Sequence, residues 1–161
     1  KKVDKSLLDE MLLAANLAPS WKNSQTPRFY VATGEKSKNA VREALPEFNR
    51  KNSENASAYI VTTVVLNRSG FDKDGTAVTE IGNGWGYYDL GLNNMALLLK
   101  ATELGISTLV MGIRDGEKLR KEFDIPKTEA VVSVIAVGYT DSKIVRPKRK
   151  SVEDFAKFYE D

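Results

Sequence analysis

The chain has 161 residues, with 24 Lys plus Arg against 22 Asp plus Glu and a formal net charge of +2 at pH 7. Such a balance argues against a nucleic-acid or membrane-surface protein. The sequence contains neither histidine nor cysteine, which excludes disulfides, thiolate nucleophiles, histidine-dependent triads and metal sites built on histidine or cysteine. Carboxylates, lysine, tyrosine or a cofactor must therefore carry any chemistry, and we expect no metal site.

The length is that of one domain, which we expect to cover residues 1–161. No apolar stretch is long enough to span a bilayer, and no signal peptide opens the chain. These features predict a cytoplasmic protein without a membrane or nucleic-acid partner.

The N-terminal third predicts two helices and a strand. Apolar residues at helical spacing favour a helix over residues 7–18, ended by the proline that follows. Residues 20–27 are typical of a polar loop, and residues 28–33 of a strand. A second helix is expected over residues 36–45, followed by a polar stretch through residue 55.

The middle of the chain contains its clearest strand and its most apolar helix. Residues 59–66 are β-branched and nearly continuous, so both faces of this strand should be covered. Residues 67–86 form a long glycine-containing loop, which is usually functional or mobile. The helix expected over residues 89–103 is apolar on almost every side, which predicts burial all round and a second subunit covering part of it.

The remaining elements complete an α+β pattern. We expect a strand over residues 106–111, a helix over 115–123, a strand over 131–137 and a last helix opened by the capping-box residues 151–154. The sequence thus predicts about four strands and five helices, without internal repeats or an obvious linker.

One short segment, Pro19-Ser20-Trp21-Lys22-Asn23-Ser24-Gln25, gathers hydroxyl, amide and ammonium groups between a helix and a strand. By its physics alone it is more often a capped, solvated loop than a binding site. Its order, Ala-Pro-Ser-x-x-Asn-x-Gln, resembles the signature of the nitroreductase family. The resemblance implies contact with FMN, bound mainly by the partner subunit, through Pro19, Ser20, Trp21, Asn23 and Gln25, with Lys22 near nicotinamide or substrate.

Three later segments are similar to the same family, in the same order. The Asp89-x-Gly91 pattern resembles the start of its central helix, which forms the dimer core; the alternative is a buried helix of a monomer. After the strand at 106–111, the resemblance places the backbone amides of Met111 and Gly112 against the flavin N5 and O4 edge, where glycine permits close approach. Asn67 and Arg68 follow the long strand, where relatives carry a polar or basic pair near the cofactor.

The C-terminal segment carries a cluster of cations. The family's sequences end with a Gly-Tyr pair followed by a proline among basic residues. A similar segment here consists of Gly138-Tyr139 and then Arg146-Pro147-Lys148-Arg149-Lys150. The resemblance implies that Lys148, Arg149 and Lys150 hold the FMN phosphate, since charge-assisted bonds to phosphate suit clustered cations. Considered alone, such a cluster is more often a solvated surface patch.

Together the resemblance implies a nitroreductase-like α+β fold, with a central mixed or antiparallel sheet of four to five strands, flanked by helices and completed by homodimerisation. Its implied activity is FMN-dependent hydride transfer from NADH or NADPH to a nitroaromatic, quinone or similar acceptor, in two half-reactions. The alternative is a non-catalytic flavin- or ligand-binding member of the same fold.

The sequence departs from the family pattern in two places. The Arg-Arg-Ser-x-Arg arm of the family is absent before Lys1-Lys2-Val3-Asp4, so the arm is either not included or truly missing, and the second case would weaken FMN binding. Gln25-Thr26-Pro27-Arg28 stands where many relatives have Gln-Pro-Trp, which could alter the wall of the substrate pocket.

Overall fold

The computed structural model describes residues 1–160 and contains a four-stranded sheet. Its strand order is β1 (Pro27–Ala32), β2 (Ala58–Val65), β4 (Glu129–Gly138) and β3 (Ser107–Met111). Every neighbouring pair is antiparallel. The predicted α+β fold is confirmed, and the sheet takes the antiparallel, four-stranded form of that prediction.

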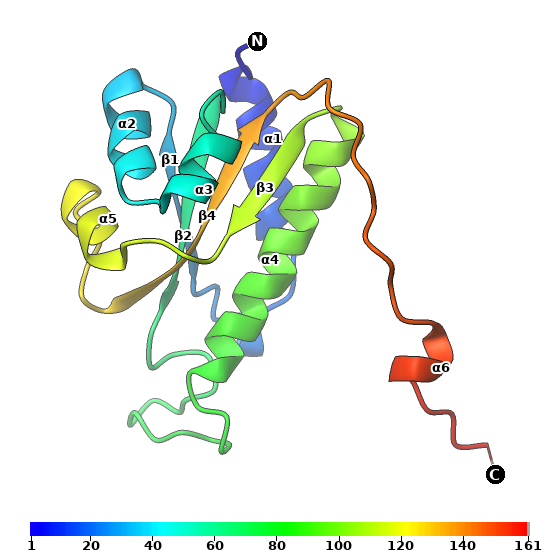
Figure 1. Cartoon of the computed structure of the whole chain (residues 1–161). Coiled ribbons are helices and arrows are strands. Elements are labelled where there is room, and N and C mark those ends of the chain that lie inside the picture. The colour runs from blue at the N-terminus through cyan, green and yellow to red at the C-terminus, as the bar shows by residue number, and fades with distance from the viewer. Residues whose placement is uncertain (161) are drawn as a thin grey trace.

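Helices cover both faces of this sheet (Figure 1). One layer consists of α1 (Lys5–Asn16) and α4 (Gly84–Glu103), which pack against each other and on one face. The other face carries α2 (Glu35–Glu43) and α5 (Gly116–Glu122), with α3 (Glu47–Asn52) beside α2. The sheet is therefore the middle layer of three.

The residues of β2 explain why two helical layers are needed. Tyr59, Ile60 and Val61 are all 0% exposed. Ile60 belongs to the core under α1 and α4, whereas Tyr59 and Val61 belong to the core under α2 and α5. Because successive side chains point to opposite faces, a continuous apolar strand must be covered twice.

The central helix α4 differs from its prediction in two ways. It begins at Gly84, five residues earlier than expected, and Gly86 in its first turn lets it approach β2 closely: a Cβ there would lie 2.8 Å from Val64 Cγ2. Within the single chain the helix is buried on one side only, which leaves the predicted cover by a second subunit untested. Leu97 is 0% exposed, but Met95 and Leu99 are 52% and 58% exposed, since the sheet and α1 cover only one side.

The polar stretch after Pro46 contains α3, a helix that the sequence did not predict. The 3-10 turn η1 (Trp21–Asn23) likewise lies within the predicted polar loop. The capping box at Ser151 is confirmed and opens α6 (Val152–Phe155). This helix lies on the C-terminal tail, residues 139–160, which follows β4, is mostly exposed and runs away from the sheet (Figure 1). Within residues 1–160, no helix combines the length and apolarity needed to cross a membrane.

The raised pKa of the Tyr30 phenol, on β1, leads us to expect that the folded protein loses stability at alkaline pH. Burial, and then the 2.9 Å bond that it donates to Glu129 Oε2, raise its pKa to about 12. The unfolded chain has the ordinary value of about 10. Because the folded state favours the protonated phenol, this contribution is present below pH 10 and is lost as the pH rises toward 12.

We therefore expect Tyr30→Phe to make the decline of unfolding free energy above pH 10 shallower, as measured by urea denaturation at successive pH values. Tyr159→Phe is the matched control, since Tyr159 is 88% exposed. If Tyr30→Phe declined as steeply as the wild type, Tyr30 would not be a source of the alkaline slope.

Candidate active site

The loop singled out in the sequence is strained. Among residues 1–160, five non-glycine residues have positive φ, between 46° and 56°: Lys22, Asn23, Gln25, Asn67 and Asp124. This left-handed conformation costs most residues with a Cβ about 1–2 kcal/mol but asparagine and aspartate less, so the strain of the loop comes mainly from Lys22 and Gln25. Four of the five are residues that the sequence proposed for cofactor or substrate contact. Such strain is characteristic of functional sites, where the surrounding structure holds it in place.

A cavity of about 410 Å³ lies beside this loop. The volume falls within the range of small-molecule sites. Apolar side chains, two arginines, and hydroxyl and amide side chains line the cavity; the lining residues are Leu12, Asn16, Ala18, Ser20, Ser24, Gln25, Pro27, Arg28, Phe29, Arg68 and Asn93. This mixture suits a flat, partly apolar ring with hydrogen-bonding edges.

The sequence did not propose Arg28 or Asn93 as cofactor or substrate ligands, although residues 25–28 were expected to alter the pocket wall; both residues line the cavity. Arg28 Nη1 donates to the carbonyl oxygens of Gln25 and Pro27, at 2.7 and 2.8 Å, and so braces the end of the loop. The antiparallel pairing of β1 with β2 brings the start of one strand beside the end of the other. That pairing, which a sequence alone does not specify, explains why Arg28 and Arg68 share a cavity.

Trp21 lies at the start of the strained loop, against Trp85, with ring centroids 4.8 Å apart. In the described part of the chain its buried Nε1 has no hydrogen-bond partner. An unsatisfied buried donor costs about 1–3 kcal/mol, although Trp21 itself does not line the cavity. Lys22 Nζ lies 5.9 Å from the Trp21 ring centroid and 3.4 Å from Asp72 Oδ1, on the exposed side of the loop.

Asn67 and the end of β3 lie outside this cavity. The Asn67 backbone N–H donates to Asn83 Oδ1 at 2.7 Å, and Asn83 Nδ2 donates to Asn67 Oδ1 at 2.9 Å. Met111 is buried in the core, and a Cβ added to Gly112 would meet no atom within 4 Å. Since β1 and β3 are the outer strands, three strand spacings, or roughly 14 Å, separate them.

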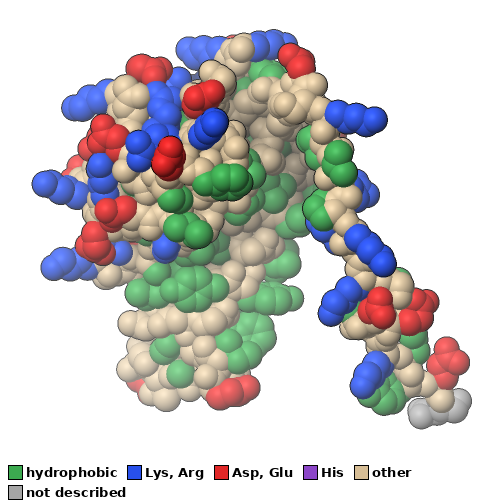
Figure 2. Space-filling model, viewed as in Figure 1, with side chains coloured by type: hydrophobic (Ala, Val, Ile, Leu, Met, Phe, Trp, Pro, Cys, Tyr) green, Lys and Arg blue, Asp and Glu red, His purple; other side chains and the backbone are tan. Residues whose placement is uncertain are grey.

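The predicted phosphate ligands Lys148, Arg149 and Lys150 lie on the exposed tail. Arg149 Nη1 donates only to a neighbouring carbonyl, that of Pro147, among the described residues. Figure 2 shows Lys and Arg side chains along this tail, separated from the body of the molecule. One chain by itself therefore does not bring the loop, the end of β3 and the basic residues together.

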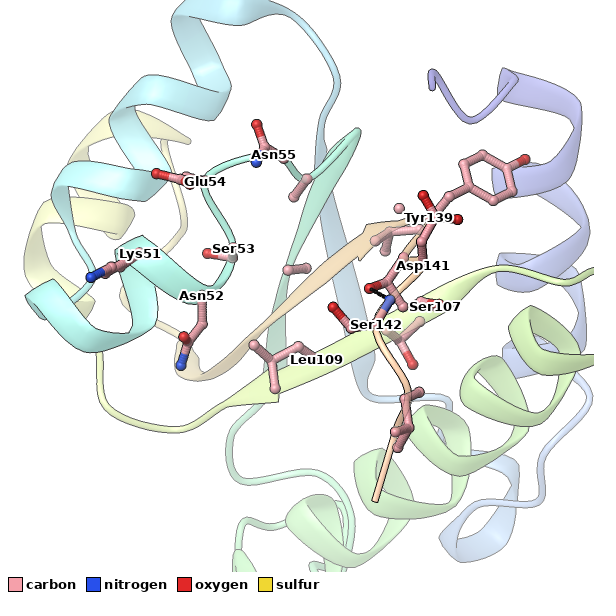
Figure 3. Close-up of a pocket in the computed structure, with 17 residues that line it drawn as sticks. Lys51, Asn52, Ser53, Glu54, Asn55, Ser107, Leu109, Tyr139, Asp141 and Ser142 are labelled. Atoms are coloured by element: carbon pink, nitrogen blue, oxygen red, sulfur yellow. Dashed lines mark hydrogen bonds between the residues drawn. The ribbon is translucent and has the colours of Figure 1, made fainter. Parts of the chain in front are cut away.

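A larger cavity, of about 730 Å³, lies between the end of α3, β3 and the first residues of the tail (Figure 3). Backbone and small polar side chains form much of it, including Ser53, Ser107 and Ser142. None of the residues proposed from the sequence lines it. Across residues 1–160, no cluster of three or more potential metal-ligating side chains is present. The smaller cavity is thus the better candidate site.

Comparison with known proteins agrees with this geometry. The model of the Nitroreductase family matches residues 1–139. The chain belongs to the nitroreductase family. No curated protein matches it. This membership confirms the family suggested by the loop, the central helix and the end of β3.

Solved structures share the nitroreductase fold over almost the whole chain. A nitroreductase family protein from Streptococcus pneumoniae TIGR4 has a TM-score of 0.83 and 22% identity, covering 99% of this chain and 92% of that one. The enone reductase CLA-ER, of gut-bacterial fatty acid saturation, has a TM-score of 0.84 and 20% identity, covering 98% and 89%. An oxidoreductase containing FMN has a TM-score of 0.82 and 25% identity, covering 98% and 82%.

The strain in this nitroreductase loop can be measured with two substitutions at Lys22, whose φ is 46°. Both Lys22→Gly and Lys22→Ala remove the ammonium group, but only glycine removes the Cβ that opposes positive φ. We expect Lys22→Gly to be more stable than Lys22→Ala by about 1 kcal/mol in urea unfolding. Equal stabilities would mean that the loop is not held in the left-handed conformation.

Proposed function

We propose that this protein is a cytoplasmic, homodimeric FMN-dependent oxidoreductase that passes hydride from NADH or NADPH to a nitroaromatic, quinone or similar acceptor. The observation that carries the proposal is the strained loop, Lys22–Gln25, bordering a cavity with two arginines in a chain of the nitroreductase family. Two structural neighbours, an oxidoreductase containing FMN and an enone reductase, support the same class of reaction.

The residues of the cavity fit a flavin. Ser20, Ser24 and Gln25 offer hydrogen-bonding groups, and Phe29 and Leu12 offer an apolar wall. Trp21, next to Ser20 but outside the lining of the cavity, carries a buried Nε1 donor without a hydrogen-bond partner among the described residues. These features match a heterocycle that is apolar on its faces and carries acceptors at its edges.

Bound FMN would supply the redox centre, N5, which accepts and donates hydride. The protein contributes orientation and shielding. Pro19, Ser20 and Asn23 would position the ring, the Met111 and Gly112 backbone would donate to its N5 edge, and the basic tail would hold the phosphate. Lys22, which is exposed, would contact nicotinamide or acceptor. No side chain has to act as a nucleophile, so a chain without histidine or cysteine can perform this chemistry.

The proposed dimer would bring together the loop, the end of β3 and the basic tail, which lie apart within one chain. The loop adjoins β1, whereas Met111 ends β3 at the opposite edge of the sheet. The outer stripe of α4 exposes Tyr88, Met95 and Leu99, at 60%, 52% and 58%. Apolar stripes of this kind on a helix mark protein contacts. A second copy seated on this stripe would bring the loop of one subunit to the β3 end and tail of the other.

The absorption spectrum of the purified protein, followed by titration with FMN, tests the proposal. We expect the visible absorption bands of a bound flavin, or tight binding of added FMN. We also expect NADH or NADPH oxidation that accelerates when menadione or a nitroaromatic is added. Failure to bind FMN would refute the proposal. Flavin binding without turnover would instead identify a non-catalytic flavin-binding protein.

A further inference from the structure

Asp89 is a buried carboxylate whose contacts set it apart from the other acidic residues. It lies near the start of α4 and is 2% exposed. Burying a carboxylate costs several kcal/mol unless donors surround it. None of the ion pairs formed within residues 1–160 includes Asp89. Hydrogen bonds from neutral groups must therefore compensate its burial.

Those hydrogen bonds come from two segments distant in sequence. The Trp21 backbone N–H donates to both carboxylate oxygens of Asp89, at 3.2 and 3.1 Å. Ser69 Oγ donates to Oδ2 at 2.5 Å. One carboxylate thus connects α4 with the first residue of the strained loop and with the segment that follows β2.

Ser69 extends this connection to the other end of the loop. Its single hydroxyl hydrogen is directed to Asp89, so its oxygen accepts from the hydroxyls of Ser24, at 2.6 Å, and Thr26, at 3.2 Å. The loop is also closed on itself, because the Gln25 N–H donates to Ser20 Oγ at 3.0 Å. Asp89 therefore controls both the start and the end of the strained segment.

We propose that Asp89 is the positioning residue of the flavin site. Three left-handed residues between Trp21 and Thr26 would relax if the ends of the loop were free. Asp89 fixes those ends through Trp21 and Ser69, and so presents the hydrogen-bonding side chains of the loop to the cavity. The inference rests on the proposed function for the identity of the ligand, but the anchoring of the loop does not depend on it.

Asp89→Asn is the sharpest test, because it keeps the shape of the side chain and replaces one acceptor oxygen by an NH₂ donor. That donor cannot pair with the Trp21 N–H, which in the wild type donates to both carboxylate oxygens. If Ser69 Oγ accepted from that donor, the Ser69 hydrogen would have to turn away from residue 89, toward Ser24 or Thr26. Ser69→Ala is the second variant, since it breaks the link to Ser24 and Thr26 while the Trp21 bond remains. Asp115→Asn is the matched control: Asp115 also accepts a backbone N–H, from Lys118 at 3.0 Å, but caps α5 on the other face.

Amide hydrogen exchange of residues 21–25 without flavin is the first measurement, and the FMN dissociation constant and visible spectrum of bound FMN are the second. Asp89→Asn should accelerate local exchange and raise the dissociation constant, each by about tenfold or more. At saturating FMN, its flavin bands should shift toward those of free FMN. Ser69→Ala should change both quantities in the same direction but less, and Asp115→Asn should leave them unchanged.

The two proposals fail separately. If the wild type bound no FMN, the proposed function would be wrong, and loop exchange alone would still decide whether Asp89 anchors the loop. If Asp89→Asn kept wild-type exchange, or if exchange accelerated while FMN affinity and spectrum stayed unchanged, the positioning role would be overturned. Should Asp89→Asn not fold, unaltered exchange and FMN affinity in Ser69→Ala would overturn it equally.

Discussion

Replacing Leu97 by glutamate is expected to unfold the protein. Leu97 is 0% exposed, at the centre of the core between α4, α1 and the sheet. The substitution removes a packed apolar side chain and buries a charge without a partner, which together cost more than about 4 kcal/mol. Since whole domains are stable by only about 5–15 kcal/mol, circular dichroism should show little or no cooperative unfolding transition for this variant.

Leu99→Glu is the matched variant, two residues later on the same helix. Leu99 is 58% exposed, so the single chain should tolerate the charge and keep its helical signal. In the proposed dimer, however, the same charge would be buried against the partner. We expect a folded monomer by light scattering, at concentrations where the wild type is expected to form the proposed dimer. A stable Leu97→Glu protein would contradict the observed core, and a dimeric Leu99→Glu protein would contradict the interface on α4.

The second large effect is expected from Lys148→Ala combined with Arg149→Ala. Each charge-assisted bond to a phosphate contributes about 1.5–3 kcal/mol, and 1.4 kcal/mol corresponds to tenfold in affinity. If both cations hold the FMN phosphate, the double variant should raise the FMN dissociation constant by about 100-fold or more. Quenching of flavin fluorescence on binding measures this constant directly.

Two controls make that result specific. Riboflavin carries the same ring without the phosphate, so its affinity should be equal in the wild type and the double variant. Lys157→Ala removes a cation from the same exposed tail and should leave FMN affinity unchanged. Unchanged FMN affinity in the double variant, or an equal loss for riboflavin, would show that the basic tail is a solvated patch.

The site was only partly predictable from the sequence. The order of residues in the loop identified Ser20 and Gln25, which do line the cavity, because a family signature is a local pattern. Arg28 and Asn93 line the same cavity but carry no local signal. Asp89 was noticed only as part of a helix start, although its carboxylate holds the loop through Trp21. Contacts between residues 68 positions apart depend on how the elements pack, which spacing along the chain does not reveal.

Residue patterns alone were enough to predict most of the helices and strands. They also required two helical layers, since the apolar residues of β2 can be buried only if helices cover both faces of the sheet. The sequence also determined the family, because the motifs stand in the required order. The burial of one side of α4, the left-handed backbone of three loop residues and the connection through Asp89 depend on the packed chain. Burial, strain and long-range hydrogen bonds are properties of the packed chain, and different packings of the same elements would change all three.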